Sequence, residues 1–122
     1  MANQWAAPAT LRRKPDRAVG PLLAALGDRT RQDIIERLRA GPRAVGELSD
    51  LLPVSRPAVS QHLKILRDAG VVTETRAGVR HYFALDAASL DILRRHFEGL
   101  WQDVLLAFAD YVKEAERARK GK

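Results

Sequence analysis

The chain contains 122 residues, of which 46% are hydrophobic and 30% are charged, and it has no cysteine. This length suits one globular domain, and the composition excludes an apolar-poor, disordered chain. The lack of cysteine excludes disulfides, thiolate metal sites and a cysteine nucleophile. No apolar run is long enough to span a membrane, and the N-terminus lacks the apolar segment of a signal peptide. We therefore expect a cytoplasmic protein without a membrane partner.

The net charge is +6, and the positive charge is concentrated in the two ends and in one internal block. Residues 54–85 carry five Lys and Arg against two Asp and Glu, whereas residues 18–53 are balanced. A basic excess favours a polyanionic partner such as nucleic acid. Basic ends often serve solubility alone, so the internal block is the more informative part.

The first part of the chain predicts an arm followed by a helical domain. Residues 1–15 show no sustained period and contain Arg12-Arg13-Lys14, so we expect a flexible basic arm. The domain is predicted to span residues 16–116, with a basic tail over residues 117–122. Between residues 17 and 26, apolar side chains recur every three or four positions, which predicts a short first helix.

Three further helices are predicted before residue 70. The second begins after Asp28, whose carboxylate can cap it, and ends before Gly41-Pro42. The third covers residues 45–52. The fourth runs from Arg56 to Ala69, with Ser55 as its cap, and a turn of very few residues joins it to the third. Two helices joined so tightly must cross steeply, which is the helix-turn-helix arrangement.

After Gly70 the apolar period changes from that of a helix to that of a strand. Residues 71–76 and 79–85 are rich in β-branched and aromatic side chains and predict a β-hairpin. An alanine disfavours positive φ, so we expect a turn longer than Ala77-Gly78, with Gly78 in the left-handed region. A long helix follows over residues 87–116. The fold class is therefore mainly α with a small β-hairpin (α+β), in the order α-α-α-α-β-β-α.

The fourth helix has two different faces at about 100° per residue. The predicted core face consists of Ala58, Val59, His62, Leu63, Ile65 and Leu66. The predicted outer face consists of Arg56, Pro57, Ser60, Gln61, Lys64 and Arg67. The outer face offers donors, acceptors and positive charge, the mixture that reads base edges and phosphates in a major groove. The alternative is an ordinary solvated face.

Four blocks of the sequence carry a family resemblance. They are residues 25–31 (ALGDRTR), 45–48 (VGEL), 54–72 (VSRPAVSQHLKILRDAGVV) and 78–85 (GVRHYFAL). In this order they resemble the ArsR/SmtB-type winged helix-turn-helix repressors, and the resemblance covers about residues 18–95. The most specific signal is the spacing of Ser55, Ser60, His62 and Leu63.

The resemblance implies a homodimer whose fourth helix docks in the major groove and whose hairpin is a wing against the DNA backbone or minor groove. The implied reading residues are Ser55, Arg56, Pro57, Ser60, Gln61 and Lys64. Arg76 and Arg80 flank the tip of the wing and would contact phosphate or the minor groove, and Arg43 is a further phosphate candidate. Surface solubility is the alternative for each arginine.

The histidines of the helix and hairpin are predicted to be structural. His62 falls on the core side of its helix beside Val59 and Leu66, so we expect a packed, hydrogen-bonded histidine. His81 alternates with Val79 and Phe83 along its strand. We expect it to belong to the packing of the hairpin rather than to a metal site.

The long helix carries an apolar seam that a small domain cannot cover. Its members recur at spacings of three and four: Leu90, Leu93, Phe97, Leu100, Val104, Ala107 and Tyr111. Trp101, Leu105, Phe108 and Val112 widen it. Exposed, they would form a sticky patch, so a second copy of the chain is implied. The predicted dimer interface comprises Leu22, Leu23, Leu26, Leu90, Leu93, Phe97, Leu100, Trp101, Val104 and Phe108. The alternative is packing against the chain's own domain.

Many members of the family sense metals through cysteines or through Asp, His and Glu on the last helix. Here that helix has one histidine, His96, and the position three residues later is Gly99, which cannot be a ligand. We predict no metal site and no cofactor, with a site across the dimer at Asp103 as the alternative. The aromatic side chains of the seam leave room for an unknown apolar small-molecule effector, or they are simply interface core.

No pattern in the sequence predicts catalysis. Ser60 and His62 lie two residues apart on a helix and point away from each other, whereas a nucleophile and its base must be within hydrogen-bond reach. The sequence therefore predicts a sequence-specific DNA-binding regulator, a homodimeric repressor of a pseudo-palindromic operator. The alternative is a winged-helix protein-interaction module without specific DNA binding.

Overall fold

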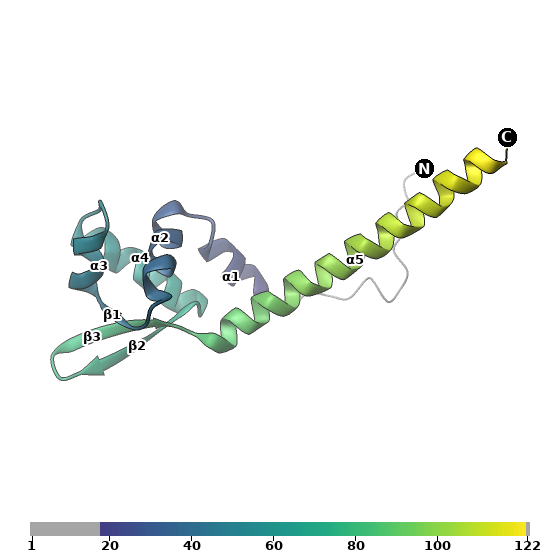
Figure 1. The fold of residues 1–122 in the computed structure, drawn as a ribbon. Coiled ribbons are helices and arrows are strands. Elements are labelled where there is room, and N and C mark those ends of the chain that lie inside the picture. The colour runs from purple at the N-terminus through teal and green to yellow at the C-terminus, as the bar shows by residue number, and fades with distance from the viewer. Residues whose placement is uncertain (1–17, 122) are drawn as a thin grey trace. The chain divides into compact units, whose positions relative to one another are not determined.

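The computed structural model describes residues 18–121 (Figure 1). The elements in chain order are α1 (Val19–Ala25), α2 (Arg29–Leu38), β1 (Arg43–Ala44), α3 (Val45–Leu51), α4 (Arg56–Ala69), β2 (Val72–Ala77), β3 (Arg80–Leu85) and α5 (Ala87–Lys120). The predicted mainly helical fold with a small sheet is confirmed. The predicted order lacked β1, because a strand of two residues has no period to detect. The predicted arm over residues 1–15 lies outside the described residues.

Contacts divide the described chain into two units, residues 18–93 and residues 94–121. The first unit contains α1 to β3 and the first turns of α5. The second unit is the rest of α5. None of the helices described is both long enough and apolar enough to cross a bilayer.

Capping side chains set the starts of α2 and α4, as predicted. Asp28 Oδ2 accepts a hydrogen bond of 3.0 Å from the backbone N–H of Arg31, and Ser55 Oγ accepts one of 3.3 Å from that of Ala58. These bonds satisfy N–H groups that lack partners within the first turn of a helix. Gly70 ends α4 with a φ of 90°, a left-handed conformation that glycine adopts without a Cβ clash.

The three strands form an antiparallel sheet in the order β1-β3-β2. In the hairpin, Ala77 pairs with Arg80, so the turn consists of Gly78 and Val79 only. The longer turn that we predicted is therefore wrong. Gly78 takes the positive φ, 64°, at the first turn position, and this leaves Ala77 in the strand. Val79 lies in the turn and is 98% exposed. The prediction that it shares a strand face with His81 and Phe83 is therefore wrong.

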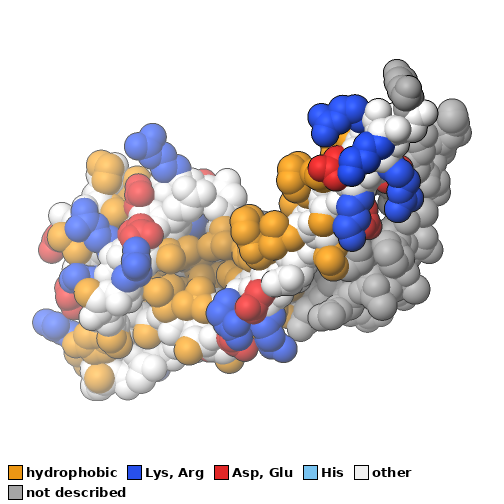
Figure 2. Space-filling model, turned by 45° about the vertical axis from the view of Figure 1, so that its right-hand side comes forward, with side chains coloured by type: hydrophobic (Ala, Val, Ile, Leu, Met, Phe, Trp, Pro, Cys, Tyr) orange, Lys and Arg blue, Asp and Glu red, His pale blue; other side chains and the backbone are white. Residues whose placement is uncertain are grey.

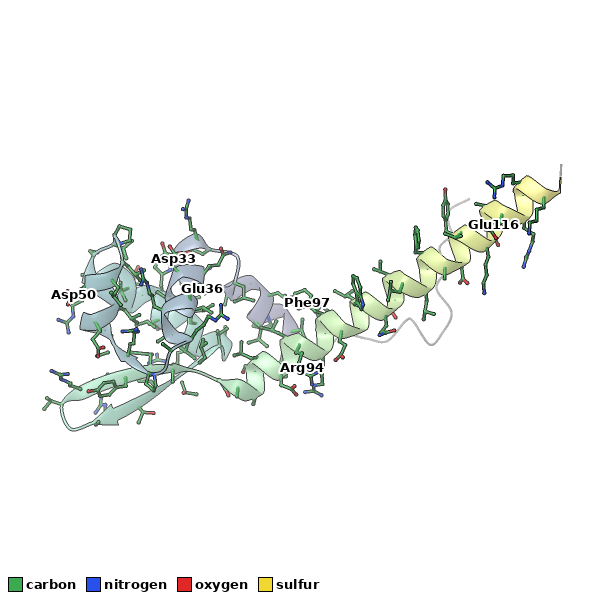
Figure 3. All side chains as sticks on the ribbon, viewed as in Figure 1. Asp33, Glu36, Asp50, Arg94, Phe97 and Glu116 are labelled. Carbon is green, nitrogen blue, oxygen red and sulfur yellow. The ribbon has the colours of Figure 1, made fainter. Side chains whose placement is uncertain are left out.

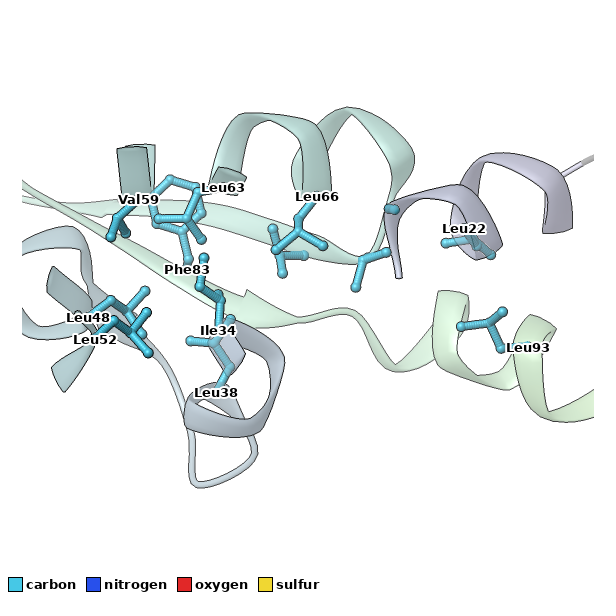
Figure 4. Packing of buried hydrophobic residues seen from close by; sticks show 13 residues of the cluster. Leu22, Ile34, Leu38, Leu48, Leu52, Val59, Leu63, Leu66, Phe83 and Leu93 are labelled. Carbon is cyan, nitrogen blue, oxygen red and sulfur yellow. The ribbon is translucent and has the colours of Figure 1, made fainter. Parts of the chain in front are cut away.

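The core of residues 18–93 lies between the helices and the sheet (Figure 4). Its members come from α1 to α5 and include Leu22, Ile34, Leu38, Leu48, Leu52, Val59, Leu63, Leu66, Phe83 and Leu93. On the predicted core face of α4, Val59, Leu63 and Leu66 are buried, and Ala58 and His62 are half-buried. Ile65 is 45% exposed, because it lies at the edge of the apolar face rather than within it.

The last helix is longer than the sequence predicted. Asp86 precedes it and accepts a hydrogen bond of 3.1 Å from the backbone N–H of Ala88. The helix continues to Lys120, beyond the predicted end at Glu116. Its last turn carries Arg117, Arg119 and Lys120, and cations at a helix C-terminus interact favourably with the helix dipole.

Candidate nucleic-acid interface

The outer face of α4 is exposed along the whole helix. Arg56, Pro57, Ser60, Gln61, Lys64 and Arg67 are all exposed, and so is Ser55 at the cap. On the opposite side, Val59, Leu63 and Leu66 are fully buried. The same face that the helical period predicted is therefore the one available to a ligand.

A groove of about 630 Å³ lies between this face of α4, the start of α3 and the hairpin. Of the predicted reading residues, Arg56, Ser60 and Lys64 line it, and Arg80 lines it from the hairpin. Ser55, Pro57, Gln61 and Arg76 are exposed outside it. The predicted residues outside the groove thus lie on the outer edge of α4, except Arg76, which lies on β2.

The start of α3 packs against the first turn of α4. A Cβ added to Gly46 would lie 3.9 Å from the guanidinium atoms of Arg56, so that guanidinium lies directly over the glycine. The carboxylates of Glu47 and Asp50 line the groove beside it; Asp50 is labelled on α3 in Figure 3. The groove is therefore lined by both acidic and basic side chains. Which of the basic side chains can contact an anionic ligand depends on their partners within the chain.

Four predicted cations have side chains that form no hydrogen bond or ion pair within the described chain. They are Arg56, Lys64, Arg76 and Arg80, whose backbones are hydrogen-bonded within α4 and the hairpin. Arg43 differs, because its Nε donates to the carbonyl oxygen of Arg37 at 2.9 Å. Its Nη1 also lies 3.9 Å from Glu47 Oε2. Arg56, Lys64, Arg76 and Arg80 are therefore better placed than Arg43 to contact an anionic ligand.

Sequence reasoning missed a cluster that joins α4 to the hairpin. Glu74 Oε2 accepts a hydrogen bond of 2.7 Å from Arg67 Nη1, and Glu74 Oε1 lies 2.5 Å from His81 Nδ1. The hydrogen bonds from His81 and then from Arg67 lower the pKa of Glu74, and the bond to Glu74 raises the pKa of Arg67. Once the strand register is known, the cluster can be found, since Glu74 and His81 are diagonal neighbours on one face.

His62 packs against the start of α2, and the prediction of a packed, hydrogen-bonded histidine is confirmed. Its side chain is 23% exposed, and Nδ1 lies 3.4 Å from Arg31 Nη1 and 3.6 Å from Asp28 Oδ2. Arg31 Nε donates to the carbonyl oxygen of Ala25 at 2.7 Å. The hydrogen bond from the Arg31 backbone lowers the pKa of Asp28, with the charges of His62 and Arg31 acting in the same direction. This cluster connects the end of α1, the start of α2 and the buried side of α4.

The two ends of the predicted dimer interface differ in burial. Leu22 and Leu93 are buried in the core of residues 18–93, and Leu23 and Leu26 are half-buried against it. Along α5, the exposed members of the predicted interface are Leu90, Phe97, Leu100, Trp101, Val104 and Phe108. Hydrophobic side chains gather along this helix in the space-filling view, and Phe97 projects from it (Figures 2 and 3). The ring of His96 packs edge-on against Phe97, with centroids 5.5 Å apart.

The part of the chain that the structure describes contains no group of three or more His, Asp or Glu side chains close enough to hold a metal ion.

Comparison with known proteins gives a consistent set of relatives. Residues 28–74 match the family described as "Bacterial regulatory protein, arsR family". The HTH-type transcriptional regulator Rv2034 of Mycobacterium tuberculosis is 48% identical over 100 residues, which cover 82% of this chain and 90% of the relative. The HTH-type transcriptional repressor SmtB of the same species is 54% identical over 61 residues, covering 50% of this chain and 45% of the relative.

Solved structures give the same result. An ArsR-like transcriptional regulator from Rhodococcus sp. RHA1 superposes with a TM-score of 0.67 at 30% identity, covering 80% of this chain and 92% of that one. The transcriptional repressor BigR from Xylella fastidiosa gives a TM-score of 0.54 at 28% identity, covering 62% and 80%. The elements that build the groove are thus found in regulators of transcription.

Proposed function

We propose that this chain, which belongs to the arsR family of bacterial regulatory proteins, represses transcription as a homodimer that binds a pseudo-palindromic operator. Its membership makes it a DNA-binding transcriptional regulator and not an enzyme. Repression, the dimer and the symmetry of the operator are the parts that we propose. As bacterial DNA lies in the cytoplasm, that is where such a regulator would act.

The observation that carries the proposal is the exposed polar face of α4 together with four cationic side chains, on α4 and the hairpin, that have no hydrogen-bond or ion-pair partner among residues 18–121. Gln61 offers an amide that can pair with a base edge, and Arg56, Lys64, Arg76 and Arg80 offer positive charge for bases or phosphates. We propose that α4 is the recognition helix and that β2 and β3 form the wing. Arg43 is a weaker phosphate candidate, because its guanidinium is bonded to a backbone carbonyl.

The support for a dimer is the apolar surface of α5. Phe97, Leu100, Trp101, Val104 and Phe108 are between 46% and 65% exposed, although each is worth roughly 1.5–3 kcal/mol when fully buried. A single chain that left them in water would present an aggregation-prone patch. We propose that the α5 helix of a second copy covers these side chains. Leu22 and Leu93 are core residues, so they would support this interface rather than form it.

An apolar effector bound between two copies would use the same surface. A shallow hollow of about 500 Å³ is lined by Phe97, Glu98, Leu100, Trp101 and Val104, which are almost all apolar. In a Trp5→Phe variant, the fluorescence of Trp101 would report such binding directly. A shift in its emission, accompanied by a change in operator affinity, would identify an effector among candidate compounds.

A footprint on the selected operator tests the proposed arrangement. Two recognition helices related by a two-fold axis should protect two half-sites one helical turn apart, roughly 34–36 Å. Selection of bound fragments from genomic DNA supplies the operator, whichever gene it controls. Protection of a single half-site by the fully assembled protein would contradict a symmetric dimer on DNA.

A further inference from the structure

The burial of the wing, formed by β2 and β3, decreases from its base to its tip. At its base, Val72 and Phe83 are buried, whereas Arg76 and Arg80 beside the tip are exposed. β1 holds the far edge of β3, where it pairs with Phe83 and the residue before it. A two-stranded hairpin is only marginally stable by itself in water. The direction of the tip therefore depends on the last contacts that the hairpin makes with the domain.

Glu74 makes such a contact at the level where burial ends. Its carboxylate accepts a hydrogen bond from Arg67 on α4 and lies within hydrogen-bond distance of His81 on β3. Glu74 faces Phe83 in the strand register, which places His81 diagonally across on the same side of the hairpin. The side chain of Glu74 is 21% exposed. A single carboxylate on β2 thus connects the recognition helix with the second strand of the wing.

The charges around Glu74 favour its ionised form. Its pKa is lowered by the hydrogen bonds from His81 and Arg67, so it is a carboxylate at neutral pH. In return, Arg67 is directed to the hairpin, although it lies on the outer face of α4 with the reading residues. The guanidinium of Arg67 is therefore engaged within the described chain, unlike those of Arg76 and Arg80.

We propose that Glu74 is a positioning residue: it fixes the angle of the wing to the recognition helix and so presents Arg80 to the DNA backbone. This inference rests on the proposed function, because it requires that Arg80 contacts DNA. A wing tip that swung freely would lose conformational entropy when Arg80 bound a phosphate, which would weaken that contact. The contribution of Arg80 to affinity therefore depends on Glu74, even though Glu74 itself does not touch DNA.

A double-mutant cycle on operator affinity tests the inference. Arg80→Ala should weaken binding about 3- to 10-fold in the wild-type background and less than about twofold in the Glu74→Gln background. Glu36→Gln is the matched control. This substitution makes the same change in charge on α2, where Figure 3 labels Glu36. It removes an exposed ion pair of 3.2 Å with Arg39, the residue that follows α2. In that background, Arg80→Ala should retain its full effect.

Substitutions of His81 separate hydrogen bonding from packing. His81→Gln keeps a donor that can reach Glu74 and should preserve the effect of Arg80→Ala, whereas His81→Ala should reduce it. Thermal unfolding of each variant identifies any that fail to fold. If Arg80→Ala weakened operator affinity equally in the wild-type and Glu74→Gln backgrounds, the inference would be overturned, although specific DNA binding would remain. Wild-type protein that bound no DNA would instead contradict the proposed function.

Discussion

Asp28 Oδ2 lies 3.6 Å from His62 Nδ1, so the residue that caps α2 also faces the buried side of α4. Arg31 completes this cluster, since its backbone N–H donates to Asp28 and its side chain bonds the last turn of α1. The position of α4 relative to α1 and α2 therefore depends on polar contacts as well as on the core. These contacts lie opposite the face that we propose reads DNA.

Replacement of Asp28 separates its capping role from its charge. Asp28→Ala should lower the free energy of unfolding measurably, because the N–H of Arg31 loses its acceptor. Asp28→Asn keeps a good capping side chain and should cost much less. Urea unfolding of the three proteins measures both values. If asparagine were as damaging as alanine, the attraction of Asp28 to His62 and Arg31 would outweigh the cap.

Substitutions on the outer face of α4 test the assigned reading residues. Gln61→Ala should reduce discrimination between the operator and altered sequences, by about 1–3 kcal/mol if the amide pairs with one base. Lys64→Ala should weaken binding to all sequences and reduce the slope of log affinity against log salt by about one. Arg37→Ala, an exposed cation on α2, is the control. Unchanged affinity and selectivity in both test variants, with the fold intact, would show that another face reads DNA.

Most of the first unit could be predicted from sequence because its signals are local. Asp28, Ser55 and Gly70 mark helix ends through side-chain or backbone chemistry that involves only neighbouring residues. The outer face of α4 follows from its period alone. These features needed no knowledge of tertiary contacts, and the structure confirms them.

The features that sequence reasoning missed depend on pairing across the fold. β1 exists because Arg43 and Ala44 meet β3, and two residues carry no period. The turn lies at Gly78 and Val79 because the register pairs Ala77 with Arg80, and register is not visible in one strand. The bond between Arg67 and Glu74 likewise requires the hairpin to lie against α4.

The stability of the protein should depend on pH through Glu74. Its pKa is lower in the folded chain than its ordinary value, so the native state binds fewer protons than the unfolded state there. The stabilisation is complete at neutral pH and is lost as the pH falls below about 4.3 and through the lowered value. Glu74→Gln should therefore be less stable than wild type at neutral pH, by less than about 1 kcal/mol. The difference should shrink on acidification.

Urea unfolding from about pH 7 to about pH 3 measures this dependence, with Glu36→Gln as the control. The control removes an exposed pair whose side chains are 71% and 64% exposed, so it should cost little at any pH. A constant difference between Glu74→Gln and wild type over this range would mean that the charge of Glu74 does not stabilise the fold.

A charge placed in the seam of α5 should separate the two copies. Leu100→Glu would bury a carboxylate in the proposed interface, so we expect a monomer by light scattering and an operator affinity at least about tenfold weaker. Leu106 is also exposed but lies on the other side of the helix, so Leu106→Glu is the matched control and should remain dimeric. A dimeric Leu100→Glu protein would place the interface elsewhere.

The most direct test of the account is fluorescence anisotropy with DNA from upstream of the gene that encodes this chain and with a scrambled control. Each is titrated at two salt concentrations. The account predicts tight binding that prefers the upstream fragment and weakens steeply with salt, because Lys64, Arg76 and Arg80 displace counterions from phosphates. Equal, weak and salt-insensitive binding to both fragments, repeated with operators selected from the genome, would contradict it.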